Sequence, residues 1–216
     1  MRNSTKSEKP AERRGRGRPR AFDPETALSQ AREVFWDAGF AASSLDELSD
    51  AMELNRPSVY AAFGDKEALY LATLDRYRDE GAAAMRDALD PNRPLQEGVR
   101  KVYAGALTLY FANKPAPRGC FLIGTAATES VRNPKVRHLL GDSLLQFDHL
   151  FEERFKTALE SGEIPRGADP AMLARLACSI MFSLAVRARA GESRRSLEAL
   201  ADAGAAMVCG AGSPSA

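Results

Sequence analysis

The residues best suited to chemistry gather in the segment N-R-P-S-V-Y-A-A-F-G-D-K, positions 55–66. Arg56 carries a planar fork of donors that fits the O6 and N7 acceptors of a guanine. Tyr60 and Lys66 add a phenol and an ammonium, which are both hydrogen-bond donors. No nucleophile paired with a base lies among them, so the segment indicates recognition of a nucleic acid rather than catalysis.

Two short helices are expected to position these groups. Ser44 followed by Glu47 forms a capping box that starts the first helix. Asn55 is the N-cap candidate of the second helix, with Pro57 in its first turn. The inward side of this second helix consists of Leu54, Val59 and Phe63. Its outward side offers Arg56, Pro57, Ser58, Tyr60 and Ala61, which is the plan of a helix-turn-helix with a short recognition helix.

The rest of the chain also has helical periodicity, and no segment alternates like a strand. With 216 residues, 44% of them hydrophobic and 27% charged, the chain is long enough for one or two globular domains. The fold class predicted is all-α with about nine helices. The domains expected are a flexible basic arm (1–21), a three-helix helix-turn-helix DNA-binding head (22–66) and a further helical domain (67–212).

The basic arm carries the clearest charge asymmetry. Residues 1–22 contain eight Lys/Arg and two Glu, a net charge of +6, whereas the whole chain has +1. Within the arm, the run 16–19 (R-G-R-P) resembles an AT-hook, in which Arg16 and Arg18 would lie in a narrow A·T minor groove. The alternative is a solvated tail that aids solubility. The adjacent helix-turn-helix favours the DNA-binding interpretation.

Residues 20–75 resemble the head of the tetracycline-repressor (TetR) family. The resemblance rests on Tyr60, two further residues, Phe63, and then Asp65-Lys66-Glu67. It implies that Ser44, Tyr60 and Lys66 contact phosphates. Glu53 departs from the pattern, because the family usually places glycine in the turn before the recognition helix. If that position needs a positive φ, glutamate costs about 1 kcal/mol there.

The recognition helix is the source of sequence preference in this prediction. Arg56 is the base-contacting candidate, and Pro57 and Ala61 offer apolar contact to thymine methyl groups. Ser58 could bond a base or a phosphate, and Asn55 completes the DNA-binding set. The partner expected is double-stranded DNA with a palindromic operator, bound by a homodimer.

The resemblance also implies a helical body that pairs two chains and holds a small-molecule inducer. The eighth and ninth helices are the dimerisation candidates, since the eighth is apolar nearly all round and the ninth is rich in Ala and Gly. No cofactor is expected, and an uncharged apolar or aromatic molecule is the predicted inducer. The candidate pocket residues are Tyr103, Leu107, Tyr110, Phe111, Phe121, Thr125, Phe147, Phe151, Met181 and Phe182, each of which could also be plain core.

The sequence leaves alternatives to a ligand-responsive repressor. The two histidines, His138 and His149, fit no zinc or di-iron pattern, so neither an enzyme nor a metal site is expected. Cys120 follows Arg118 at a predicted helix start, where a thiolate would be stabilised, so a thiol-based redox-sensing repressor is one alternative. A non-regulatory architectural protein for A·T-rich DNA is another, although such a protein does not need the helical body.

The expected location is the cytoplasm, without a membrane. The charged N-terminus lacks the apolar core of a signal peptide. The apolar run 171–186 is interrupted by Arg175 and is too short to span a bilayer, so it indicates a buried helix.

Overall fold

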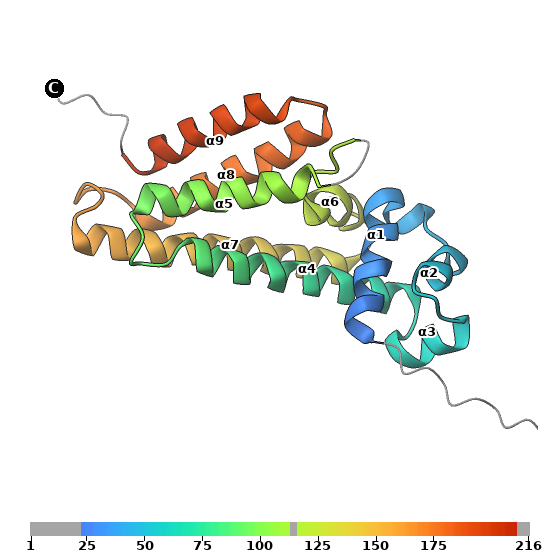
Figure 1. Ribbon diagram of the computed structural model, residues 1–216. Coiled ribbons are helices and arrows are strands. Elements are labelled where there is room, and N and C mark those ends of the chain that lie inside the picture. Colours follow the sequence, from blue (N-terminus) through green and yellow to red (C-terminus); the bar gives the residue numbers. More distant parts are fainter. Residues whose placement is uncertain (1–22, 113–115, 211–216) are drawn as a thin grey trace, which may run out of the picture.

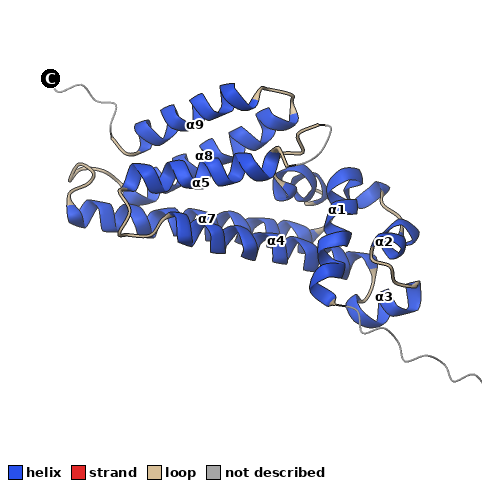
Figure 2. Cartoon of the chain, viewed as in Figure 1, coloured by secondary structure: helices blue, strands red, loops and turns tan. Residues whose placement is uncertain are grey.

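The computed structural model describes residues 23–112 and 116–210. Within these ranges it consists of nine α-helices, one π-helical segment and no strand (Figure 2), which confirms the all-α prediction. The predicted basic arm, with Arg16 and Arg18, lies outside the described residues. The elements are α1 (Pro24–Ala42), α2 (Leu45–Ala51), α3 (Arg56–Phe63), α4 (Lys66–Ala88), α5 (Leu95–Tyr110), η1 (Leu122–Ala126), α6 (Ala127–Glu129), α7 (Pro134–Ser161), α8 (Pro170–Arg189) and α9 (Arg194–Val208).

The helices form two groups along an elongated molecule (Figure 1). Helices α1, α2 and α3 lie together at one end and contact the start of α4. In the body, the long helices α4 and α7 pack against each other, and α8 packs against α7, α5 and α9. The recognition helix α3 therefore lies at the end of the molecule where α4 begins, and the C-terminal end of α4 points toward the other end.

Side-chain caps explain where most helices begin. Each of seven helices is preceded by a residue whose side chain accepts a hydrogen bond from a backbone N–H of the first turn, which satisfies groups that have no partner within the helix. These residues are Asp23, Ser44, Asn55, Asp65, Asn133, Asp169 and Ser193. Helix α5 has no such cap; instead Glu163, from the loop after α7, accepts from the Leu95 N–H at 2.7 Å.

Two segments depart from a regular α-helix. Helix α1 extends to Ala42, but Gly39 has φ +79° and breaks the regular helical backbone there. The stretch that begins at Leu122 is a π-helical segment followed by the short α6. In that segment the Thr125 hydroxyl donates to the Phe121 carbonyl at 2.9 Å, a competing bond of the kind that perturbs helical ladders.

An aromatic cluster joins the head to the body. Trp36 of α1 is 2% exposed, and its ring centroid lies 5.3 Å from that of Tyr77 in α4 and 5.4 Å from that of Phe121. The guanidinium of Arg118 stacks over the indole at 4.2 Å and bonds Glu33 of α1 at 2.8 Å. Because these contacts join α1 of the head to residues of the body, a movement of α1 would change the packing of the body residues that it contacts.

Helix α8 is the one described helix that is long and apolar enough, by length and composition, to cross a membrane. It packs against three neighbouring helices and buries Ala177, Cys178 and Leu184 at 2% exposure or less. A core helix of a helical bundle satisfies the same composition test. On its outer side Met172 and Val186 are more than half exposed.

Candidate nucleic-acid interface and ligand cavity

The recognition helix α3 presents the face that the sequence predicts. Val59 is fully buried and anchors the helix, with Phe63 half-buried beside it. Asn55 caps its start by accepting from the Ser58 N–H at 2.9 Å. Arg56, Pro57, Tyr60 and Ala61 are exposed and Ser58 is half-buried, so the candidate DNA-contacting residues share one accessible surface.

Arg56 is not free in this surface. Its Nε and Nη2 donate to the two carboxylate oxygens of Asp46 in α2, at 2.7 and 2.5 Å. These side-chain hydrogen bonds hold the pKa of Asp46 below its ordinary value. The pair occupies the Nε edge of the guanidinium and leaves the Nη1–Nη2 edge available to a guanine.

Two of the predicted phosphate contacts, Ser44 and Lys66, lie at the start of α2. The capping box is confirmed: the Glu47 N–H donates to Ser44 Oγ at 3.1 Å, and the Ser44 N–H donates to the Glu47 carboxylate at 2.7 Å. Lys66 lies beside this turn, where its ammonium donates to the Ser43 carbonyl and stacks over the ring of Phe40 at 4.6 Å. Desolvation lowers the pKa of Lys66.

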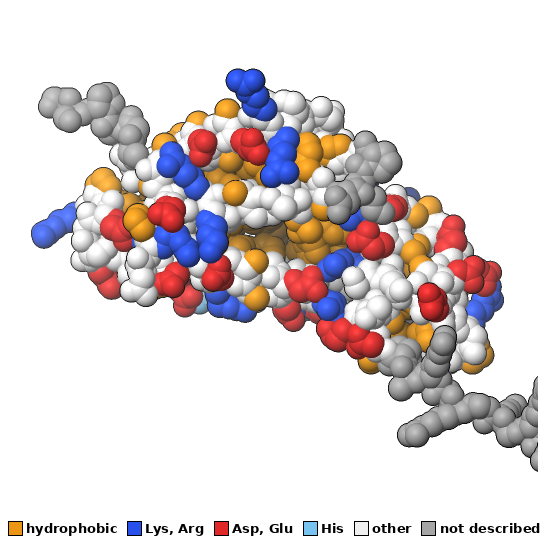
Figure 3. Space-filling model, in the orientation of Figure 1, with side chains coloured by type: hydrophobic (Ala, Val, Ile, Leu, Met, Phe, Trp, Pro, Cys, Tyr) orange, Lys and Arg blue, Asp and Glu red, His pale blue; other side chains and the backbone are white. Residues whose placement is uncertain are grey.

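The folded head has a net negative charge, although its expected partner, DNA, is also negatively charged. Residues 23–66 contain nine Asp/Glu and three Lys/Arg, a net charge of −6. Figure 3 shows acidic side chains over this end of the molecule. The arm carries +6, so the arm and the folded head have opposite net charges.

The turn between α2 and α3 contains the discordant residue. Glu53 has φ +53°, and it is the one non-glycine residue with a positive φ in the described chain. Its N–H donates to the Asp50 carbonyl at 3.1 Å, and the next N–H, of Leu54, donates to the Ser49 carbonyl at 2.9 Å. The turn therefore requires the left-handed conformation, which costs a side chain about 1–2 kcal/mol.

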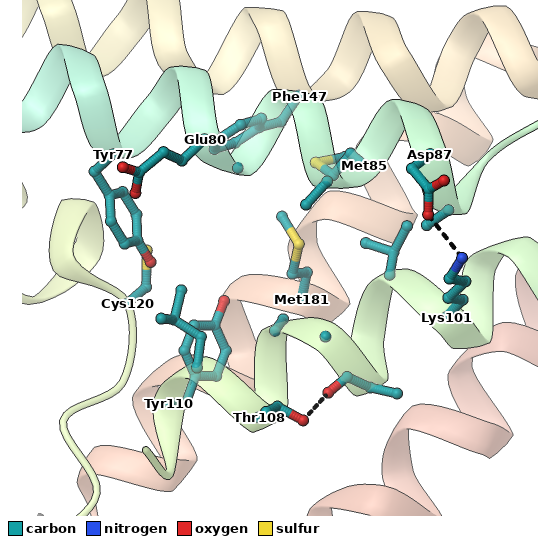
Figure 4. A pocket seen from close by; sticks show the side chains of 18 of the residues that line it. Tyr77, Glu80, Met85, Asp87, Lys101, Thr108, Tyr110, Cys120, Phe147 and Met181 are labelled. Atoms are coloured by element: carbon teal, nitrogen blue, oxygen red, sulfur yellow. Dashed lines mark hydrogen bonds and ion pairs between the residues drawn. The ribbon is translucent and has the colours of Figure 1, made fainter. Parts of the chain in front are cut away.

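A cavity of about 580 Å³ opens between α4, α5, α7 and α8 (Figure 4), within the size range of small-molecule sites. Figure 3 shows a hollow with apolar side chains between the two long layers of the body. The lining residues are Arg32, Tyr77, Glu80, Gly81, Ala84, Met85, Asp87, Ala88, Lys101, Val102, Ala104, Gly105, Ala106, Thr108, Leu109, Tyr110, Cys120, Phe147, Met181 and Phe182.

The sequence prediction of this lining needs correction. Phe147 and Met181 line the cavity, as do Tyr110 and Phe182. The remaining candidates lie elsewhere: Tyr103, Leu107, Phe121, Thr125 and Phe151 are buried in the core, and Phe111 is half-buried outside the lining. Helix α4 supplies lining residues that the prediction missed. An excess of aromatic residues does not show which of them are in the packed core and which face an opening.

The environment of Cys120 also differs from the prediction. The thiol is buried, and burial raises its pKa. The Tyr77 hydroxyl donates to Cys120 Sγ at 3.5 Å, while Arg118 bonds Glu33 and Asp37 instead. The expected stabilisation of a thiolate by Arg118 is therefore wrong, and the thiol-sensing alternative loses its physical basis.

Comparison with known proteins agrees with this architecture. A family model described as "Bacterial regulatory proteins, tetR family" matches residues 27–73, and one described as "Tetracyclin repressor-like, C-terminal domain" matches residues 97–203. The HTH-type transcriptional repressors ComR and BdcR of Escherichia coli (strain K12) are each 32% identical to the chain. The alignments cover 88% of this chain and 90% of ComR, and 86% of this chain and 88% of BdcR.

A solved structure extends the comparison to a DNA complex. A cysteine mutant of the TetR family regulator CifR, complexed with 26-bp double-strand operator DNA, superposes with a TM-score of 0.78. It is 34% identical in sequence, and the match covers 87% of this chain and 98% of the CifR chain.

Proposed function

This chain belongs to the TetR family of transcriptional regulators, and from that premise we propose that it is a cytoplasmic repressor which binds a palindromic operator as a homodimer. In this proposal a small molecule that enters the body cavity releases the operator. As a family member the chain is a DNA-binding regulator. Repression, the two-fold operator and release by an inducer are the parts that we propose.

The observation that carries the proposal is the continuity of α4. This single 23-residue helix begins at Lys66, beside the helix-turn-helix, and Tyr77, Gly81 and Met85 farther along it line the cavity. A helix of this length is stiff, so a shift at the cavity is transmitted to the head. A ligand that binds one position of α4 better than the other changes the population of DNA-competent heads.

Two helix surfaces support the homodimer. Met172, Leu176 and Val186 on α8 and Met207 on α9 are exposed apolar side chains. On α9, Ala199 and Ala203 are exposed, whereas Gly204 is buried against Ile180 of α8. An exposed apolar surface of this kind is typical of a protein–protein contact. We propose that the outer faces of α8 and α9 pack against a second copy.

The DNA contacts proposed follow from the surface of the head. Arg56 would donate to a guanine, with Pro57 and Ala61 against thymine methyl groups and Ser58 on a base or phosphate. Ser44, Tyr60 and Lys66 would bond phosphates. Asn55 acts by capping α3, so its contribution to binding is to hold the recognition helix in place.

The experiment that tests the proposal measures operator binding and its release together. Genomic fragments bound by the full chain would be selected, and the enriched sequence examined for two-fold symmetry. Gly105 of α5 lines the cavity, and a Cβ at this position would meet no atom within 4 Å. Gly105→Trp therefore fills the cavity, whereas Gly105→Ala is the matched control.

The expected results separate the parts of the proposal. Gly105→Ala retains both operator binding and release by a ligand found in a compound screen. Gly105→Trp is insensitive to that ligand, either held on the operator or permanently off it. A selected sequence without two-fold symmetry would overturn the dimeric operator, and a Gly105→Trp protein with unchanged ligand response would overturn the cavity as the inducer site.

A further inference from the structure

One end of the cavity contains a tyrosine hydroxyl that has no partner within the described residues. Tyr110 of α5 is 3% exposed and lines the cavity, and Figure 4 shows its hydroxyl pointing into the open space. No residue in the described ranges forms a hydrogen bond with this hydroxyl. Because this hydroxyl faces the cavity and has no partner in the protein, it is available to a ligand.

Other buried tyrosines of the body show what is missing at Tyr110. The Tyr103 hydroxyl donates to the Ala177 carbonyl at 3.1 Å, and the Tyr70 hydroxyl donates to Thr125 Oγ1 at 2.8 Å. Tyr77, which also lines the cavity, donates to the sulfur of Cys120. Tyr110 is therefore the tyrosine in the cavity wall whose donor has no acceptor within the described chain.

The charged groups of the cavity wall are mutually neutralised. Glu80 pairs with Arg32 at 2.5 Å, and Lys101 pairs with Asp87 at 2.7 Å. Arg32 Nε has no hydrogen-bond partner in the described residues, but the charge of Arg32 is paired with Glu80. An ionic ligand would therefore have to compete with an existing ion pair for its countercharge. Between the two ion pairs, Met85, Phe147 and Met181 provide an apolar surface.

We infer that the cavity takes an uncharged, largely apolar molecule with a hydrogen-bond acceptor such as a carbonyl oxygen, and that the Tyr110 hydroxyl donates to this acceptor. The inference rests on the proposed function, because it specifies the chemical class of the inducer. Burial raises the pKa of Tyr110 well above its ordinary value, so the phenol keeps its proton and acts as a donor.

A matched series of compounds tests the inference without operator DNA. Benzophenone supplies two apolar rings and a carbonyl, diphenylmethane has the same rings without an acceptor, and 4-benzoylbenzoate adds a negative charge. Their dissociation constants would be measured by calorimetry on the full chain. Tyr110→Phe removes the donor, and Tyr103→Phe is the matched control because Tyr103 lies outside the cavity lining.

The wild-type protein is expected to bind benzophenone about 10-fold more tightly than diphenylmethane, as one net hydrogen bond provides. Tyr110→Phe removes this preference and leaves diphenylmethane affinity unchanged, whereas Tyr103→Phe retains the preference. Tighter binding of 4-benzoylbenzoate would overturn the neutrality of the ligand. Equal affinities in the wild type, a preference that survives in Tyr110→Phe, or no binding of any probe would overturn the inference.

Operator release is measured separately, so that the two failures can be told apart. Probes that bind with the expected preference but leave the operator complex intact support the ligand class and contradict the proposed induction. A ligand that releases the operator in both wild type and Tyr110→Phe, with equal potency, supports the proposed function and contradicts the role of Tyr110.

Discussion

Arg56 and Asp46 form a two-point ion pair across the helix-turn-helix, with nitrogen–oxygen distances of 2.7 and 2.5 Å. Both side chains are more than half exposed, so the pair contributes little to the stability of the protein. Its effect is geometric. The carboxylate fixes the plane of the guanidinium and leaves the outer edge of the fork directed away from α2.

Arg56→Ala is expected to weaken binding to the selected operator by about 1–3 kcal/mol and to relax the preference at one base pair in each half-site. Asp46→Ala should relax the same base pair with a smaller loss, because Arg56 remains but is no longer oriented. Affinities for all four bases at each position provide the measurement. Equal weakening on every sequence would show that Arg56 contacts phosphates only.

Glu53→Gly is expected to stabilise the protein by about 1 kcal/mol, because Glu53 has φ +53° and glycine adopts this conformation without steric cost. Urea denaturation would measure the change. Glu53→Ala is the control: it removes the same carboxylate but keeps the strained backbone, so it should give no comparable gain. If both variants are equally stabilised, repulsion by the glutamate charge is the cause and strain is not.

Deletion of residues 1–21 is expected to lower the salt dependence of DNA binding, because these residues hold the positive charge that the head lacks. Each lost phosphate contact reduces the slope of log affinity against log salt by about 0.9. A double substitution, Arg16→Gln with Arg18→Gln, should account for a large part of the change on A·T-rich flanks. An unchanged slope would place the arm away from the DNA.

Glu163 is expected to make stability depend on acid pH. Burial opposes ionisation, but the Leu95 N–H and Arg154 outweigh it and hold the pKa of Glu163 below 4.5. The carboxylate therefore stabilises the fold above the unfolded-state pKa, and this contribution is lost as pH falls through the lower folded-state value. Unfolding free energies between pH 7 and pH 3 would show the loss.

The variants of this site have distinct expected outcomes. Glu163→Ala leaves Arg154, which is 3% exposed, without its carboxylate, and should destabilise the protein by about 3 kcal/mol at neutral pH. Glu163→Gln should lose less stability, and its unfolding free energy should fall less steeply between pH 7 and pH 3. Glu160→Gln, at an exposed position near the end of α7, is the control. If the unfolding free energy of Glu163→Gln falls as steeply with decreasing pH as that of the wild type, other carboxylates cause the pH dependence.

The elements of the head were predictable because their signals are local. The capping box of Ser44 and Glu47, the cap at Asn55 and the inward Val59 depend only on residues within a few positions, and the structure has them as predicted. The family resemblance drew attention to Glu53 as the residue that would be strained if the turn needs a positive φ, and the structure gives it φ +53°. Local spacing is therefore sufficient to predict a helix and its cap.

The cavity was not predictable in the same way. Tyr103 and Tyr110 are seven residues apart, nearly two turns of α5, and so lie on similar sides of that helix. Yet the Tyr103 hydroxyl bonds α8, whereas that of Tyr110 faces the cavity. The surroundings of each tyrosine are thus set by residues of other helices, such as α4 and α8, that are distant in the sequence. The Arg56–Asp46 pair likewise depends on the angle between α2 and α3.

The aromatic junction beneath α1 has a spectroscopic consequence. Trp36 is the single tryptophan of the chain, and its buried indole Nε1 has no hydrogen-bond partner among the residues that the structure describes. The ring contacts Tyr77 of the cavity wall on one side and the guanidinium of Arg118 on the other. The protein thus has one tryptophan fluorophore, placed where the two halves meet. Its emission would follow rearrangement of that junction in unlabelled protein, in real time.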